Sequence, residues 1–233
     1  MMRSARFATL AAAALGLAAP VARATAQDGA KPTVAVLFFN NTGFTKDARD
    51  YDALSKGLAD FLIARMGENP NIRLIDREQA QRMFDAQKLA VGTRMDRELA
   101  VRIGKLLGAQ HMIFGGYMAD PQGNLRIDAR AVGVERGVIE YTDRLQDKGD
   151  NILALIDALS ARMSAGMNLP AAQAGTSPAS PLPMKYAIMY GRALDLSDHG
   201  DRAGAAELLG ALLKDFPAFE PAKKARARLT SGG

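Results

Sequence analysis

The stretch that decides the fold is TVAVLFF, residues 33–39, an apolar run with no polar residue after Thr33. A run of this kind is typical of a strand covered on both faces, as the central strands of parallel sheets are. Residues 40–50 (NNTGFTKDARD) then have the composition of a turn. The stretch therefore predicts the first strand of an α/β sheet, placed near its centre.

A crossover helix and a second strand follow. Between residues 51 and 66 the apolar side chains recur at helical spacing, and Gly67 and Pro70 close the segment. Residues 72–75 (IRLI) supply the second strand. Together these segments have the length of a βαβ unit with a right-handed crossover.

The second strand runs directly into a charged helix through Asp76, Arg77 and Glu78. Asp76 stands where the helix begins, and Gln79 comes three residues later. The pair fits a capping box, in which the Asp76 carboxylate accepts a hydrogen bond from the first turn. We interpret the cluster as a joint between two elements rather than an active site, with Arg77 and Glu78 on the exposed first turn.

The rest of the sheet is predicted from two further patterns. A helix over residues 96–107 ends at Gly108, and residues 111–114 form the third strand. After a turn at residues 120–124, apolar residues alternate with polar ones, which indicates a strand with one solvated face. The polar members of this alternation are Arg126, Asp128 and Arg130.

The composition of the chain changes after one more strand and one more helix. Residues 138–144 return as an antiparallel hairpin, and residues 151–167 form an amphipathic helix. Residues 168–183 are rich in Pro, Ala, Ser and Gly and are interpreted as a linker. We predict an α/β fold: a three-layer mixed sheet built from βαβ units that ends in an antiparallel hairpin, plus a small all-helical tail.

The tail resembles one tetratricopeptide repeat. Its packing positions would be Ala193, Leu196, Ala205, Leu209 and Leu212, with Pro217 at the end of the second helix. A single repeat cannot bury its own apolar face. That face must meet the α/β domain, a second copy of the chain or a partner protein. Tyr186 and Tyr190 are expected at exposed positions of the first helix, where they could serve an interface, although plain packing is the commoner role.

The first residues have the pattern of a secretory signal. A basic start with Arg3 and Arg6 precedes an apolar run, and small residues offer cleavage after Ala26, or after Ala24 as the second choice. An uncleaved anchor is disfavoured because the run is shorter than the roughly 20 residues of a membrane span. The chain has no cysteine, so neither disulfides nor a lipid-modified cysteine are available. We expect a soluble periplasmic protein that is not a lipoprotein.

These boundaries give a four-part organisation. The predicted parts are a signal peptide (1–26), an α/β domain (27–167), a linker (168–183) and a helical hairpin (184–233). Cleavage lowers the formal charge from +5 to +2, because the leader carries three arginines and no acidic residue. With this small charge, no tryptophan and 6% aromatic residues, nucleic acid is not an expected partner.

The sequence contains no recognisable catalytic, cofactor or metal site. Its two histidines, His111 and His199, have no second donor at ligand spacing, and neither a phosphate-binding glycine loop nor a nucleophile elbow is present. Acidic residues gather in two loops, and a hydrolase that uses them is the alternative from a different class. Those residues are Asp47, Asp50 and Asp52 in one loop, and Asp143, Asp147 and Asp150 in the other.

Two motifs resemble those of a known family. They are LIDREQAQRMFDAQ, at residues 74–87, and IGKLLGAQHMIFGGY, at residues 103–117. The chain from about Thr33 to Met167 is similar to the CsgG-like domain, whose members carry an Asp-Arg after the second strand and a Gly-Ala step into the third. Amino-terminal domains of TolB type and periplasmic activators of peptidoglycan synthases look similar.

The resemblance implies a non-enzymatic periplasmic component that assembles or transports envelope material through protein contacts. Protein partners in the cell envelope and a second copy of the chain are the implied partners, and no cofactor or stable membrane insertion is expected. Two alternatives remain open: a ring- or pore-forming outer-membrane secretion subunit, and a periplasmic activator of an envelope enzyme. The missing lipidation cysteine and the lack of spare membrane strands separate the chain from the secretion channel.

Overall fold

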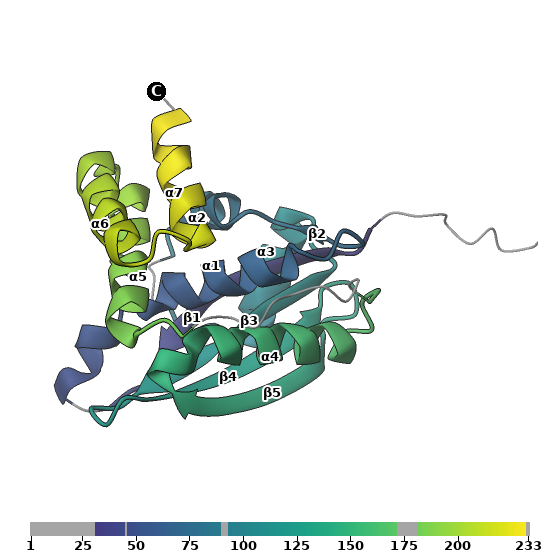
Figure 1. The fold of residues 1–233 in the computed structure, drawn as a ribbon. Coiled ribbons are helices and arrows are strands. Elements are labelled where there is room, and N and C mark those ends of the chain that lie inside the picture. Colours follow the sequence, from purple (N-terminus) through teal and green to yellow (C-terminus); the bar gives the residue numbers. More distant parts are fainter. Residues whose placement is uncertain (1–30, 45, 90–92, 172–180, 232–233) are drawn as a thin grey trace, which may run out of the picture. The chain divides into compact units, whose positions relative to one another are not determined.

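A five-stranded mixed sheet forms the centre of the fold (Figure 1). The computed structural model describes residues 31–44, 46–89, 93–171 and 181–231. In the spatial order β2-β1-β3-β4-β5, the strands are β2 (Arg73–Leu74), β1 (Thr33–Asn41), β3 (His111–Ala119), β4 (Asn124–Gly133) and β5 (Val138–Lys148). Strand β1 pairs parallel with β2 and β3, whereas β3, β4 and β5 pair antiparallel.

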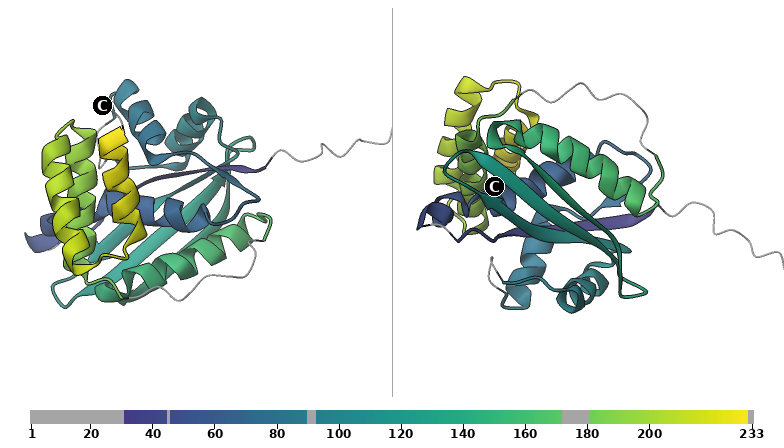
Figure 2. Two further views of the ribbon diagram at one scale, coloured as in Figure 1. Left: turned by 45° about the horizontal axis from the view of Figure 1, so that its top comes forward. Right: turned by 90° about the horizontal axis from the view of Figure 1, so that it is seen from below.

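Helices cover both faces of this sheet, so the prediction of a three-layer mixed α/β fold is confirmed (Figure 2). One face carries α1 (Leu54–Met66) and α4 (Ile152–Gly166), and the other carries α2 (Arg77–Ala86) and α3 (Arg97–Leu107). Short 3-10 helices, η1 (Lys46–Tyr51) and η2 (Gly149–Asn151), precede α1 and α4.

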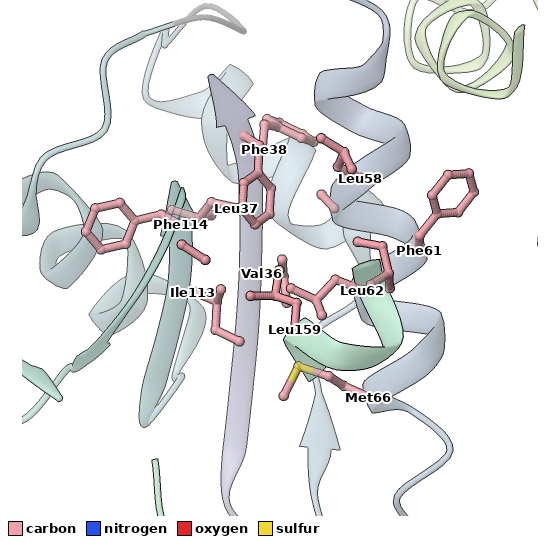
Figure 3. Packing of buried hydrophobic residues seen from close by; sticks show 14 of the residues in the cluster. Val36, Leu37, Phe38, Leu58, Phe61, Leu62, Met66, Ile113, Phe114 and Leu159 are labelled. Atoms are coloured by element: carbon pink, nitrogen blue, oxygen red, sulfur yellow. The ribbon is translucent and has the colours of Figure 1, made fainter. Parts of the chain in front are cut away.

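The core fills both sides of the sheet, and one part of it lies under the α1–α4 layer. Figure 3 shows Leu62 of α1 and Leu159 of α4 gathered against Val36 of β1 and Ile113 of β3. All four side chains are buried. Strand β1 is buried along residues 33–39, because its neighbours and both helical layers enclose it, as the apolar run predicts.

Several boundaries differ from the sequence pattern. The third strand, expected at residues 111–114, continues to Ala119, and the second, expected at 72–75, covers only Arg73–Leu74. The helix expected from residue 51 starts at Leu54, because η1 and a turn occupy the preceding residues. The hairpin strand expected at residues 138–144 continues to Lys148, paired along its length with β4. Helix α3 ends as predicted at Gly108, whose φ of 67° is the left-handed conformation that glycine adopts without a Cβ clash.

The tail consists of three helices that pack on the rest of the chain. These are α5 (Met184–Asp198), α6 (Arg202–Asp215) and α7 (Glu220–Ser231). Helix α5 lies against α1, and residues 31–233 form one compact unit. The tail's apolar face was expected to meet the α/β domain, a second copy of the chain or a partner protein. The structure shows that it packs on the α/β domain of the same chain.

The ends of the predicted linker are bound to the domain. Leu182 is buried, and its N–H donates to the carbonyl oxygen of Asp150 at 3.1 Å. At the other end, Asn69 donates to the carbonyl oxygen of Pro170 at 2.8 Å. Residues 172–180 and the predicted signal peptide lie outside the described residues.

Asp76 is the N-cap residue of α2, at the predicted start of the helix. Its side chain, however, makes no capping hydrogen bond. The prediction of a capping box is therefore wrong, although the predicted position of the helix start is right. Both Asp76 and Gln79 are exposed, so water can satisfy the carboxylate and the N–H groups of the first turn. Helix α3, by contrast, has a side-chain cap, because the Asp96 carboxylate accepts from the Leu99 N–H at 2.8 Å.

The two aspartates give a matched test of helix capping. We expect Asp96→Ala to lower the free energy of unfolding by about 1 kcal/mol, the usual contribution of an N-cap. Asp76→Ala should change it by less than about 0.5 kcal/mol, as other exposed substitutions do. Urea denaturation of both variants measures the difference. Equal losses of unfolding free energy in the two variants would contradict the structure, in which Asp96 caps its helix and Asp76 does not.

Candidate functional site

Arg77 is buried, so the prediction that it lies on an exposed first turn is wrong. Its side chain is 2% exposed and donates from Nη1 to both carboxylate oxygens of Asp198, at 2.9 and 2.7 Å. Asp198 is the last residue of α5, 121 positions away in the sequence. The burial arises because the tail covers the start of α2, which the local sequence pattern does not reveal.

Arg77 belongs to an ionic cluster, defined here as Lys56, Asp60, Arg77, Tyr190 and Asp198. Lys56 Nζ lies 2.7 Å from Asp198 Oδ2, and Arg77 Nε lies 3.7 Å from Asp60 Oδ1. The Tyr190 hydroxyl donates to Asp60. The two cations are balanced by two carboxylates, and the cluster joins α1, α2 and α5. Lys56 also binds the half-exposed Asp195 at 2.7 Å.

Burial shifts the titration of the cluster. It raises the pKa of Asp60 above its usual value, although the Tyr190 hydrogen bond and the Arg77 charge oppose this shift. Burial and the neighbouring Asp60 carboxylate raise the pKa of Tyr190 well above 10.0. For Arg77, burial lowers the pKa, but the Asp198 hydrogen bond and charge outweigh it and leave the pKa raised. Arg77 is therefore held as a cation, and its role is to join elements.

The two tyrosines proposed for an interface lie in different environments. Tyr190 is fully buried, so the expectation that it is exposed is wrong. Its ring stacks on Phe61 of α1 with a centroid distance of 5.1 Å and meets Phe219 edge-on at 5.7 Å. Tyr186 is half-buried, donates to Asp215 and packs edge-on against Phe216 at 4.7 Å. The Tyr190 ring therefore joins the tail to α1, whereas the Tyr186 ring joins α5 to the end of α6.

The predicted repeat-packing residues line the inside of the tail. Ala193, Ala205, Leu209 and Leu212 are buried, whereas Leu196 is half-buried. Pro217 is exposed and stands between α6 and α7, where a proline can end a helix. Whether these helices descend from a tetratricopeptide repeat stays a prediction.

An exposed surface on the sheet carries four arginines. We call this surface the arginine face. It consists of Arg94, Arg126, Arg130 and Arg144. Strand β4 places its alternate side chains Leu125, Ile127 and Ala129 in the core, so Arg126 and Arg130 point to the opposite side. Arg144 of β5 lies across from Asp128, and the strand register brings it to the same side.

The arginine face is hollowed and has an excess of positive charge. A depression of about 330 Å³ is lined by the four arginines, together with Asp128 and Phe44. Asp128 accepts from Arg126 at 2.9 Å and also from Arg144. Among the described residues, Arg94 and Arg130 have no ion-pair partner. Phe44, from the loop after β1, is 92% exposed.

Sequence reasoning identified only part of this surface. The alternation of Arg126, Asp128 and Arg130 predicts a solvated strand face, and that prediction agrees with the structure. It does not place Arg94 or Phe44 there, because both lie on loops far from β4 in the sequence. The signal that could have found Phe44 is a large aromatic residue inside a turn-like segment.

The residues with catalytic or ligand chemistry do not converge. In the described ranges, no group of three or more histidine, cysteine or acidic side chains is placed to hold a metal ion. His111 lies 2.7 Å from Glu140, and His199 lies 3.6 Å from Asp195. Of the loop acids, Asp52 accepts from Asn41 and Asp150 accepts from the Met184 N–H. Over the same ranges, every helix is too short or too polar to cross a bilayer.

The comparison with protein families supports the resemblance predicted from the motifs. The model of the curli production assembly/transport component CsgG matches residues 19–120, which end directly after β3. The resemblance to the CsgG-like family is therefore confirmed over this part of the chain. A search of curated protein sequences finds no match.

Several solved structures are similar to parts of the chain. The LpoB C-terminal domain from Salmonella enterica is 16% identical, with 53% of this chain and 87% of that chain covered and a TM-score of 0.37. Lipoprotein GNA1162 from Neisseria meningitidis is 10% identical, with coverage of 57% and 96% and a TM-score of 0.40. The PelC dodecamer from Paraburkholderia phytofirmans is 13% identical, with coverage of 61% and 92% and a TM-score of 0.34.

Proposed function

We propose that this protein is a non-enzymatic component of the cell envelope that assembles or transports other molecules by binding proteins. The match of residues 19–120 to a family of assembly and transport components carries this proposal. Export by a cleaved signal peptide and a periplasmic location without a lipid anchor belong to the same proposal. The lack of convergence among the described acidic and histidine side chains agrees with a binding role.

The arginine face is the surface that we assign to protein binding. It is exposed, and two of its arginines, for which the described part of the chain supplies no ion-pair partner, can bind acidic side chains at little desolvation cost. Arginine is among the residues enriched in protein interfaces, and an exposed aromatic residue such as Phe44 can fill a pocket on a partner. The ionic cluster is a poorer candidate, because its members are buried and already paired.

Charge reversal on this face tests the proposal. We expect Arg94→Glu combined with Arg130→Glu to abolish the capture of an envelope protein that co-purifies with the unaltered chain. The matched control is Arg82→Glu combined with Lys214→Glu, which makes the same change in charge at exposed helical positions away from the face. Affinity purification from envelope extract, followed by quantitative mass spectrometry, measures the difference.

The result that would contradict the proposal is equal loss, or equal retention, of co-purifying proteins in both double variants. Equal loss would mean that net charge alone governs capture, and equal retention would place the binding surface elsewhere. Melting curves of both double variants are also measured, because the capture results can be compared only if both variants are folded.

A further inference from the structure

The depression of the arginine face lies over a strand position that has no side chain. Asn40, Gly116, Asp128 and Arg144 stand opposite one another in a row across β1, β3, β4 and β5. Gly116 is the member of this row that contributes no side chain, so the depression of about 330 Å³ has part of its floor there. A glycine inside a strand often marks the close approach of a ligand or another chain. The row therefore leaves room for a side chain that enters from a partner.

Arg94 is held beside this floor by Asn40. The Asn40 side-chain amide donates to the carbonyl oxygen of Thr93 at 3.1 Å and accepts from the Met95 N–H at 3.4 Å. The two hydrogen bonds flank Arg94 in the sequence, so they hold its backbone against the end of β1. An arginine placed in this way loses less conformational freedom on binding than one on an unattached loop.

Arg130 stands on the β4 side of the floor. It comes two residues after Asp128 on β4, so it is the diagonal neighbour of Gly116, at a distance that a long side chain can span. The Asp128 carboxylate is already paired with the other two arginines of the face. For Arg94 and Arg130, the described part of the chain supplies no ion-pair partner. The excess charge over the depression thus belongs to two arginines, one on the β1 side and one on the β4 side of Gly116.

We infer that an acidic side chain of a partner protein enters the depression above Gly116 and binds between Arg94 and Arg130. The inference rests on the proposed function and specifies what the arginine face recognises in a partner. Guanidinium groups bind a carboxylate through charge-assisted hydrogen bonds, and two of them suit a single carboxylate with its two oxygens. Phe44, which lines the depression and is 92% exposed, then packs against an apolar residue next to the acidic one.

A protein segment fits this surface better than an anionic membrane does. Membrane-binding surfaces insert apolar side chains at the level of the lipid headgroups and surround them with basic residues. Here the arginines surround a hollow with a glycine at its floor. A single side chain can enter such a hollow, whereas a flat lipid surface covers it without reaching the floor.

Nuclear magnetic resonance titration with two short peptides at low ionic strength tests the inference. The probe is acetyl-Leu-Glu-Leu-amide, and acetyl-Leu-Gln-Leu-amide is its uncharged control. We expect the glutamate peptide to bind the unaltered protein at least about tenfold more tightly and to shift the amide signal of Gly116. Arg94→Gln combined with Arg130→Gln should abolish this preference. The matched control, Arg82→Gln combined with Arg226→Gln, removes two exposed helical arginines outside the depression and should keep it.

Asp128→Asn keeps the test decisive if the double variant loses its fold. The substitution releases two further arginines from their carboxylate, so the glutamate peptide should bind about fivefold more tightly, while the glutamine peptide should bind as before. Absence of this gain, equal binding of the two peptides by the unaltered protein, or loss of the preference in the control variant would overturn the inference. Tighter binding of inorganic phosphate than of the glutamate peptide, or binding of phosphatidylglycerol vesicles that this peptide does not displace, would also overturn it.

Failure of the inference can be told apart from failure of the proposed function. If Arg94→Glu combined with Arg130→Glu still captures the envelope proteins, the proposed binding surface is wrong. If that variant loses them but the unaltered protein shows no preference for the glutamate peptide, the inference alone is wrong. The arginine face would then bind proteins without an acidic side chain in the depression.

Discussion

Arg77→Met is expected to lower the free energy of unfolding by about 3 kcal/mol. The substitution leaves the carboxylates of Asp198 and Asp60 in a buried site without the guanidinium that pairs with them. Removing one partner of a buried pair commonly costs about 3–5 kcal/mol. The lower end applies here because Lys56 still contacts Asp198 at 2.7 Å. Urea denaturation followed by circular dichroism measures the change.

A double-mutant cycle separates the ion pair from simple loss of packing. Asp198→Asn alone should also destabilise the protein, but the double variant with Arg77→Met should lose less than the two single losses combined. Arg82→Met is the control, because Arg82 is an exposed arginine on the same helix and should change stability by less than about 0.5 kcal/mol. Additive losses in the cycle would refute the coupling between Arg77 and Asp198.

Gly191→Ala is expected to push the tail away from the domain and to destabilise the protein by about 3 kcal/mol. Helices α1 and α5 approach closely at Gly57 and Gly191. A Cβ atom added at Gly191 would lie 1.8 Å from the carbonyl oxygen of Ala53, a backbone atom that cannot move aside. Overpacking of this kind typically costs about 1–3 kcal/mol, and a clash with backbone justifies the upper value.

Gly210→Ala provides a control with the opposite sign. Gly210 lies within α6, and an added Cβ there would meet nothing within 4 Å. This substitution should stabilise the protein by up to about 1 kcal/mol, through the higher helix propensity of alanine. Denaturation curves give the stabilities, and limited proteolysis with mass spectrometry shows whether the tail is released. A Gly191→Ala protein as stable as the Gly210→Ala protein would mean that the tail docks differently.

The order of elements and their approximate ends were determined by the sequence itself. The apolar run at residues 33–39 encodes a covered strand, and the alternation after residue 124 encodes a strand with one wet face, because side-chain periodicity follows backbone geometry. Gly108 ends α3 for a purely local reason, the left-handed conformation of its backbone. The two motifs at residues 74–87 and 103–117 also carried the resemblance to the CsgG-like family.

Tertiary structure decided which polar side chains are buried and what they contact. Arg77 looks like an exposed first-turn residue until α5, more than a hundred positions away, brings Asp198 onto it. Tyr190 has the spacing of a surface residue and is buried because Asp60 and Phe61 of α1 face it. Local periodicity gives the face of a helix on which a residue lies. Whether another element covers that face depends on contacts between distant segments, so the complete arginine face could be recognised only in the folded chain.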